Sequence, residues 1–142
     1  MAKRILIPVD AVTQSQTVLT YALEEYPDAE ITILHVIDPR EFRTYGGIEG
    51  WIDLTQVGEQ RRAHAKRLVE TIQRRAADQG KTVETGVVIG KAAPTIIEYA
   101  TDHDSDHIIM GSRRRSGINR LLLGSVAEKV VRESPIPVTI VG

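Results

Sequence analysis

The sequence predicts a single-domain α/β protein, a three-layer sandwich in which a five-stranded parallel sheet lies between two layers of helices. Two observations predict this class. Apolar runs with the length of buried strands alternate along the chain with longer segments whose apolar residues recur at helical spacing. Strands that alternate with helices form parallel sheets with helices on both faces. A chain of 142 residues, of which 42% are hydrophobic, is long enough to bury one core of this kind.

The predicted strands are mostly continuous apolar runs, as expected where a parallel sheet is buried on both faces. The first covers residues 4–10 and contains Pro8, which has no backbone N–H to donate and should therefore lie near the end of the strand. The other four strands are predicted over residues 30–37, 82–89, 107–110 and 138–141.

Four helices are predicted between these strands. The first begins near Thr13 or Ser15, either of which can cap it. The second is a long polar helix over about residues 54–79, whose apolar residues form one stripe. The third has Pro94 in its first turn, and the fourth ends at about Glu133.

The composition excludes several classes of function. The formal net charge of −1 offers no overall attraction to nucleic acid or to an acidic membrane. Because the chain has no cysteine, disulfides, thiolate metal sites and cysteine nucleophiles are excluded. The four histidines lack the spacing of metal ligands, and no apolar run is long enough for a signal peptide or a membrane span. We therefore expect a cytoplasmic protein with no nucleic-acid or membrane partner and no metal site built from side chains.

The sequence also lacks the motifs of common enzyme classes. It contains neither the P-loop pattern GxxxxGK[ST] nor GxGxxG after the first strand, and no GxSxG elbow. His35 lies in the middle of a predicted strand and is interpreted as a core histidine with a satisfied hydrogen bond rather than as a catalyst. No residue is therefore predicted to be catalytic, and the protein is not expected to be a dedicated enzyme.

The predicted strands end in short segments that should meet at one edge of the sheet. In sheets of this class, ligands bind beyond the carboxyl ends of the strands, where the strand order reverses. A nucleotide fits such a crevice, with its base between the strand ends and its phosphates over a basic loop. The segments expected to converge are residues 8–10, 36–38, 89–90 and 110–112.

The segment after the fourth strand has the features of a phosphate site. Gly111 ends the apolar run, three arginines follow at residues 113–115, and Gly124 and Ser125 stand where the last helix begins. A helix N-terminus presents unpaired N–H groups and the positive end of the helix dipole, and glycine lets a ligand approach closely. The same pattern fits an ordinary connection with solvated arginines, and spacing alone does not separate the two interpretations.

Asp10 is the acid at the end of the first predicted strand. Its carboxylate could accept a hydrogen bond from a base amino group or from a ribose hydroxyl. It could equally cap the helix that follows.

Taken in order, these segments resemble the universal stress protein family over nearly the whole chain. The motifs that carry the resemblance are ILIPVD, LHVID, VVIGKAAPTIIEYA, DHIIMGS, LLLGSVAEKVV and PVTIV. The resemblance implies a Rossmann-like fold of the adenine nucleotide alpha hydrolase-like type, with residues 1–142 as one universal stress protein domain. It also implies a role in stress response and survival, and a homodimer. The last strands would pair in that dimer through Val138, Thr139, Ile140 and Val141.

The resemblance further implies a phosphate site. Nucleotide-binding members of the family carry glycine, two residues, glycine, nine residues, glycine, and then serine or threonine. Here Gly111 matches the first glycine, and Gly124 with Ser125 matches the last pair. Arg114 stands in place of the middle glycine.

The resemblance also implies which residues contact the nucleoside. Asp10 matches the acid that holds adenine or ribose, and Val36 matches the position that lines the base. The expected ligand is ATP, or AMP or ADP, with Mg²⁺ or Mn²⁺ sharing the phosphate charge. Any ATP hydrolysis is expected to be slow. The predicted nucleotide-binding residues are Pro8, Val9, Asp10, Val36, Met110, Gly111, Ser112, Arg113, Arg114, Gly124, Ser125 and Val126.

Arg114 leaves two interpretations open. Its guanidinium could bind phosphate in place of backbone contacts, or its side chain could fill the phosphate space. In the second case the protein would be a nucleotide-free dimeric interaction module of the same fold. The irregular segment at residues 40–53 would then contact partners.

Overall fold

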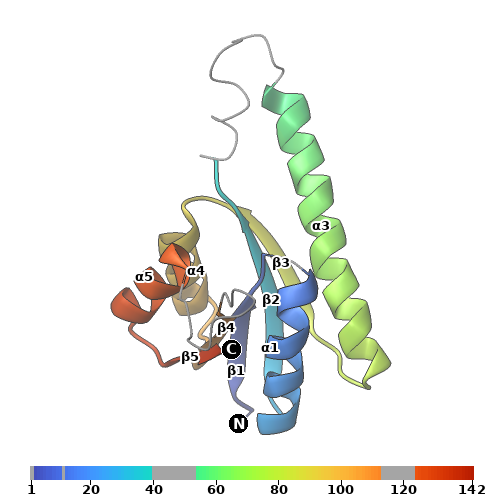
Figure 1. Ribbon diagram of the computed structural model, residues 1–142, viewed down its shortest axis with the longest axis vertical. Coiled ribbons are helices and arrows are strands. Elements are labelled where there is room, and N and C mark those ends of the chain that lie inside the picture. Colours follow the sequence, from blue (N-terminus) through green and yellow to red (C-terminus); the bar gives the residue numbers. More distant parts are fainter. Residues whose placement is uncertain (1, 11, 40–53, 113–123) are drawn as a thin grey trace, which may run out of the picture.

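The computed structural model of the chain describes residues 2–10, 12–39, 54–112 and 124–142. Its centre is a parallel sheet of five strands in the order β3-β2-β1-β4-β5 (Figure 1). The predicted class, a five-stranded parallel α/β sheet, is therefore confirmed. The strands are β1 (Arg4–Pro8), β2 (Glu30–Ile37), β3 (Glu84–Ile89), β4 (His107–Gly111) and β5 (Val138–Val141).

Helices cover both faces of this sheet. They are α1 (Val12–Glu25), α3 (Leu54–Asp78), α4 (Ala92–Asp102) and α5 (Ser125–Glu133). In Figure 1, α1 and α3 lie on one side of the strands, and α4 and α5 lie on the other. None of the helices in the described part of the chain is long and apolar enough to cross a membrane.

Two apolar clusters join the layers. Ile5 and Ile7 of β1 pack with buried residues of α1 and α3, whereas Leu6 packs with those of α4 and α5. This division arises because successive side chains of a strand point to opposite faces of the sheet. All three side chains are at most 2% exposed, so β1 is the centre of the core.

Three predicted strand bounds were wrong. The first strand ends at Pro8 rather than at residue 10, although the N–H of Val9 still donates to the carbonyl of Leu34 at 2.8 Å. The third begins at Glu84 rather than at residue 82, and the carbonyl of Val83 instead accepts a hydrogen bond from the Gln73 side chain of α3 at 2.9 Å. The fourth strand ends at Gly111 rather than at residue 110. The bounds predicted for the second and fifth strands are confirmed.

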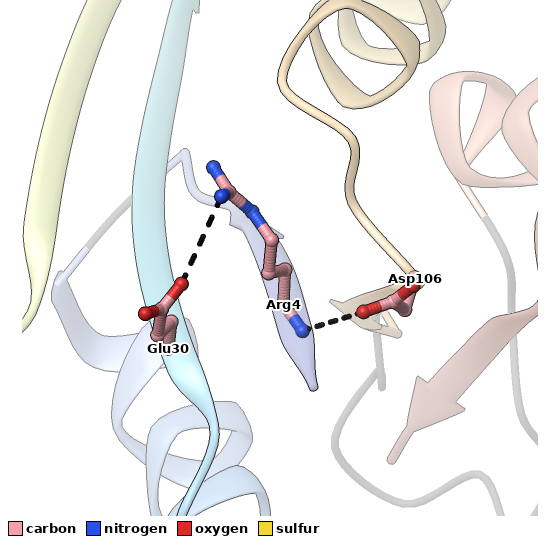
Figure 2. A network of polar contacts seen from close by, with 3 residues as sticks. All are labelled: Arg4, Glu30 and Asp106. Atoms are coloured by element: carbon pink, nitrogen blue, oxygen red, sulfur yellow. Dashed lines mark hydrogen bonds and ion pairs between the residues drawn. The ribbon is translucent and has the colours of Figure 1, made fainter. Parts of the chain in front are cut away.

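The amino edge of the sheet is held by a polar network around Arg4 (Figure 2). The backbone N–H of Arg4 donates to the carboxylate of Asp106 at 2.9 Å, and the N–H of Asp106 donates back to the Arg4 carbonyl at 2.7 Å. The Arg4 guanidinium lies 3.9 Å from the carboxylate of Glu30. Arg4 therefore ties the start of β1 to the starts of both neighbouring strands.

Candidate functional site

The strand order reverses at β1. The chain runs from β1 through β2 to β3 on one side, and then returns to place β4 and β5 on the other side. In parallel sheets this is the position where a crevice opens at the carboxyl ends of the strands. A cleft of about 770 Å³, part of it open to solvent, lies there.

The cleft is lined by the ends of β1, β2 and β4, by the first turns of α1, and by the starts of α4 and α5. Most of the residues predicted for the site meet in it: Pro8, Val9, Asp10, Val36, Met110, Gly111, Gly124, Ser125 and Val126. The remaining lining residues are Gln14, Ser15, Val18, Leu34, Ala92, Ile96 and Ala127.

Three predicted site residues are not in this group, and two of them lie outside the described residues. Ser112 follows β4 but does not line the cleft. Its N–H donates to the carbonyl of Val141 at 2.9 Å, and its buried hydroxyl has no hydrogen-bond partner among the described residues. Arg113 and Arg114 lie outside the described residues, as does the segment at residues 40–53.

Two contacts hold the end of β1 in place. Val9 donates its N–H to Leu34, the residue that pairs with Pro8, at 2.8 Å. Its carbonyl accepts a hydrogen bond from Nδ1 of His35 at 2.7 Å. The satisfied hydrogen bond predicted for His35 is thus present, although the side chain is half-buried rather than fully inside the core. Asp10, the next residue after Val9, is exposed at the mouth of the cleft.

At the end of β4, the absence of a side chain brings α1 close to the sheet. Gly111 is the last residue of β4, paired with Val141, rather than a stop outside the strand. A Cβ at this position would lie 3.1 Å from a methyl group of Val18, tighter than ordinary van der Waals contact. Gly111 therefore lets α1 pack against the floor of the cleft.

Two helices begin at the cleft without a side-chain cap. The N-cap residues are Lys91 for α4 and Gly124 for α5, and neither makes a side-chain hydrogen bond to the first turn. Ala92 and Ser125, the first residues of these helices, both line the cleft. Unpaired N–H groups at a helix start, together with the positive end of the dipole, favour anions. The cleft can therefore accept a negatively charged group on its helical side.

The polar groups of the cleft suit binding better than proton transfer. Asp10 is the acid among the described lining residues, beside the amide of Gln14 and the hydroxyls of Ser15 and Ser125. No cluster of metal-ligating side chains occurs in the part of the chain that the structure describes.

Among the described residues, the clear shifts in pKa occur away from the cleft. Burial and the nearby Lys3 ammonium lower the pKa of His107, at the start of β4. Burial and the Glu84 carboxylate raise the pKa of Tyr99, on α4. Neither residue lines the cleft, so these shifts give it no acid or base.

Gln14 and Ser15 are the polar residues of the cleft that the strand ends did not predict. Both belong to α1, and Ser15 is only 4% exposed. The prediction that Thr13 or Ser15 caps this helix was wrong, because the helix already begins at Val12. The available signal was helical phase, since residues 14, 15 and 18 share one face of a helix that starts at Val12.

Comparison with known proteins agrees with this architecture. A model of the universal stress protein family matches residues 1–142. Universal stress protein MJ0577 of Methanocaldococcus jannaschii is 32% identical over 154 aligned positions, which cover 99% of this chain and 95% of the relative. The solved structure of MJ0577 superimposes with a TM-score of 0.78, at 31% identity, over 99% of this chain and 96% of that one.

More distant solved structures share the fold. A universal stress protein of Archaeoglobus fulgidus, in complex with dAMP, is 20% identical with a TM-score of 0.70 over 99% of this chain and 98% of that one. A member of the family from Arabidopsis thaliana, with AMP bound, is 18% identical with a TM-score of 0.68 over 98% and 90%. Because the family model matches the full length of the chain and MJ0577 is 32% identical to it, the chain belongs to the universal stress protein family.

Proposed function

We propose that this protein binds an adenine nucleotide, ATP or its relatives AMP and ADP, in the cleft at the carboxyl ends of the strands. The observation that carries the proposal is the meeting of three strand ends and two uncapped helix starts around one cleft. Such a cleft offers apolar walls for a base and N–H groups for phosphates. Support also comes from the two family members solved with dAMP and with AMP.

The lining residues suggest a role for each side of the cleft. Val36 and Pro8 provide apolar surface for the base, and the exposed Asp10 carboxylate can accept a hydrogen bond from a ribose hydroxyl. The phosphates would lie at the start of α5, where Gly124 and Ser125 line the cleft and the first turn has no side-chain cap. Gly124 favours phosphate contact there because it carries no side chain that could shield the backbone.

We further propose that a divalent cation, Mg²⁺ or Mn²⁺, shares the phosphate charge when ATP is bound. Asp10 is a single acid, so the cation would be held mainly by phosphate oxygens and water. The described lining residues offer no histidine, glutamate or lysine to activate water. We therefore expect at most slow hydrolysis. We propose that the protein instead acts in stress survival by binding the nucleotide in the cytoplasm.

A homodimer through β5 is part of the proposal. This strand stands at the end of the sheet, with β4 on one side, and all four of its residues are partly exposed. An exposed edge strand is a template for pairing with another chain, and the edge of a second copy would cover it. Sedimentation at tens of micromolar should show a dimer, since about this concentration preserves an interface of standard size. A monomer alone would contradict the proposal.

The nucleotide proposal is tested by calorimetry with ATP and magnesium on protein that releases no nucleotide when denatured. Wild-type protein should bind. Asp10→Ala should weaken binding by about 10-fold, the loss expected for a hydrogen bond to a charged group. Asp102→Ala is the matched control, because Asp102 is exposed at the end of α4 and does not line the cleft.

The opposite result would favour an interaction module. If wild-type protein binds no nucleotide and Arg114→Gly gains binding, the arginine fills the phosphate space in the native chain. The nucleotide proposal would then be withdrawn.

A further inference from the structure

The side chain of His35 reaches across from β2 to the end of β1. Nδ1 of His35 lies 2.7 Å from the carbonyl oxygen of Val9, in a partly buried position. A carbonyl oxygen only accepts hydrogen bonds, so Nδ1 carries the proton and donates it. The neutral ring with its proton on Nδ1 and the imidazolium both supply this donor.

This bond lies one residue beyond the β1–β2 ladder. The register of the two strands ends where Pro8 pairs with Leu34, and the N–H of Val9 makes one last backbone contact to the Leu34 carbonyl at 2.8 Å. His35 then holds the other side of Val9 through a side chain. The peptide unit fixed by this second contact joins the Val9 carbonyl to the N–H of Asp10.

His35 lies outside the lining of the cleft. Val36, the next residue of β2, lines the cleft and packs with the cluster of α4 and α5, whereas His35 is not among the lining residues. Successive side chains alternate between the faces of a strand, so His35 belongs to the face covered by α1 and α3. The contact from the His35 ring to the Val9 carbonyl connects it to the Val9–Asp10 peptide at the edge of the cleft.

We propose that His35 is a positioning residue for the nucleotide site. By donating to the Val9 carbonyl, it fixes the direction in which Asp10 leaves the sheet and enters the cleft. The hydrogen bond from Nδ1 to the Val9 carbonyl is the basis for the positioning of Asp10. The expected effect on ATP affinity rests on the proposed nucleotide binding.

The first test compares three variants by calorimetry with ATP and magnesium, and by thermal unfolding. His35→Leu removes the donor and should weaken ATP binding by about 3- to 10-fold, the equivalent of one lost hydrogen bond. His35→Asn should restore binding to within about twofold of wild type, because the amide nitrogen of Asn lies as many bonds from Cα as Nδ1 does.

His103→Leu is the matched control for the loss of a ring hydrogen bond. Nδ1 of His103 donates to the Tyr99 carbonyl at 2.9 Å, near the amino edge of the sheet and away from the cleft. This variant should bind ATP like wild type, whatever its unfolding temperature. A folded His35→Leu protein with wild-type affinity would overturn the positioning role.

The second test needs no nucleotide, and so separates the failure of this inference from a failure of the proposed function. Long-range ¹H–¹⁵N spectra at neutral pH should place a proton on Nδ1 of His35. The amide ¹⁵N signal of Asp10 should move in His35→Leu and return toward its wild-type position in His35→Asn. If wild-type protein binds no nucleotide, these spectra still decide the role of His35. A ring protonated on Nε2 alone, or an Asp10 signal unchanged in His35→Leu, would refute it.

Discussion

At Gly86 on β3, the lack of a side chain lets the hydroxyl of Tyr99, on α4, lie against the sheet. A Cβ on Gly86 would stand 2.7 Å from that hydroxyl oxygen and 3.4 Å from a methyl group of Leu34. The Tyr99 ring is also stacked on the His103 ring, with centroids 3.8 Å apart, so its movement is limited. The position of α4, whose first residue lines the cleft, therefore depends on this glycine.

Gly86→Ala should lower the free energy of unfolding by about 1–3 kcal/mol, as other overpacked substitutions do. Urea denaturation measures the change. Adding Tyr99→Phe should relieve part of the loss, because it removes the clashing oxygen. Gly58→Ala is the glycine control, since nothing lies within 4 Å of a Cβ at that position in α3. It should stabilise the protein by about 0.5–1 kcal/mol. Equal effects at the two glycines would contradict the steric account.

His107 should make stability depend on pH. It is 7% exposed, its Nε2 lies 2.6 Å from the Thr139 hydroxyl oxygen, and its ring forms a T-shaped pair with the Tyr26 ring. Burial and the Lys3 ammonium lower its pKa in the folded protein. As pH falls below the ordinary histidine value of about 6.5, the unfolded chain gains a proton that the folded chain resists. Stability should therefore fall on acidification.

Thermal unfolding between pH 7.5 and pH 5 tests this linkage. The loss of stability on acidification should be smaller in His107→Gln than in wild type. His64→Gln, at an exposed position of α3, should leave the wild-type dependence unchanged. A pH dependence that is identical in His107→Gln and wild type would show that other groups cause it.

At the scale of elements, α5 has a buried valine next to an exposed one. Val130 is fully buried against the sheet, whereas Val131 is 45% exposed. Val130→Ala should lower the free energy of unfolding by about 2 kcal/mol through lost burial and a small cavity. Val131→Ala should change it by less than about 0.5 kcal/mol. Chemical denaturation of both variants checks the orientation of the helix whose start lies at the cleft, and equal losses would contradict it.

The elements were predictable where local pattern and tertiary packing agree. β2 and β5 have the expected bounds, because an apolar run bounded by breakers leaves little choice. β1 was predicted too long because the apolar run continues past Pro8, although the strand itself stops there. The ladder ends where Pro8 pairs with Leu34, although β2 continues to Ile37 in register with β3. Pro8 has no N–H to donate, so the ladder stops at the proline and not at the end of the apolar run.

The site was predictable to a similar extent. Strand ends such as Val9 and Met110 follow from topology alone, because parallel strands share one carboxyl edge. The contributions of Gln14 and Ser15 depend on how α1 is rotated about its axis against the sheet. The bond from His35 to the Val9 carbonyl depends on register between strands. Helical phase groups residues 14, 15 and 18 on one face of α1, but neither the direction of that face nor the register between strands can be obtained from one segment of sequence.

Across the whole molecule, the two edges of the sheet differ in their contacts. The amino edge carries the Arg4 and Asp106 contacts that fix register, and the carboxyl edge carries the cleft. Asp106→Ala removes the acceptor of the Arg4 N–H and should lower the free energy of unfolding by about 0.5–1.5 kcal/mol. Its affinity for ATP should stay within about twofold of wild type. A large loss of affinity in a stably folded Asp106→Ala protein would show that the edges are coupled.

The most direct test of the account is a titration of ¹⁵N-labelled protein with AMP, followed residue by residue in amide spectra. Saturable shifts should concentrate at the carboxyl edge, at Asp10, Val36, Gly124 and Ser125. The amides of Arg4, Glu30 and Asp106 at the opposite edge should stay in place. Absence of saturable shifts, or shifts centred on the amino edge, would contradict the assignment of the cleft as a nucleotide site.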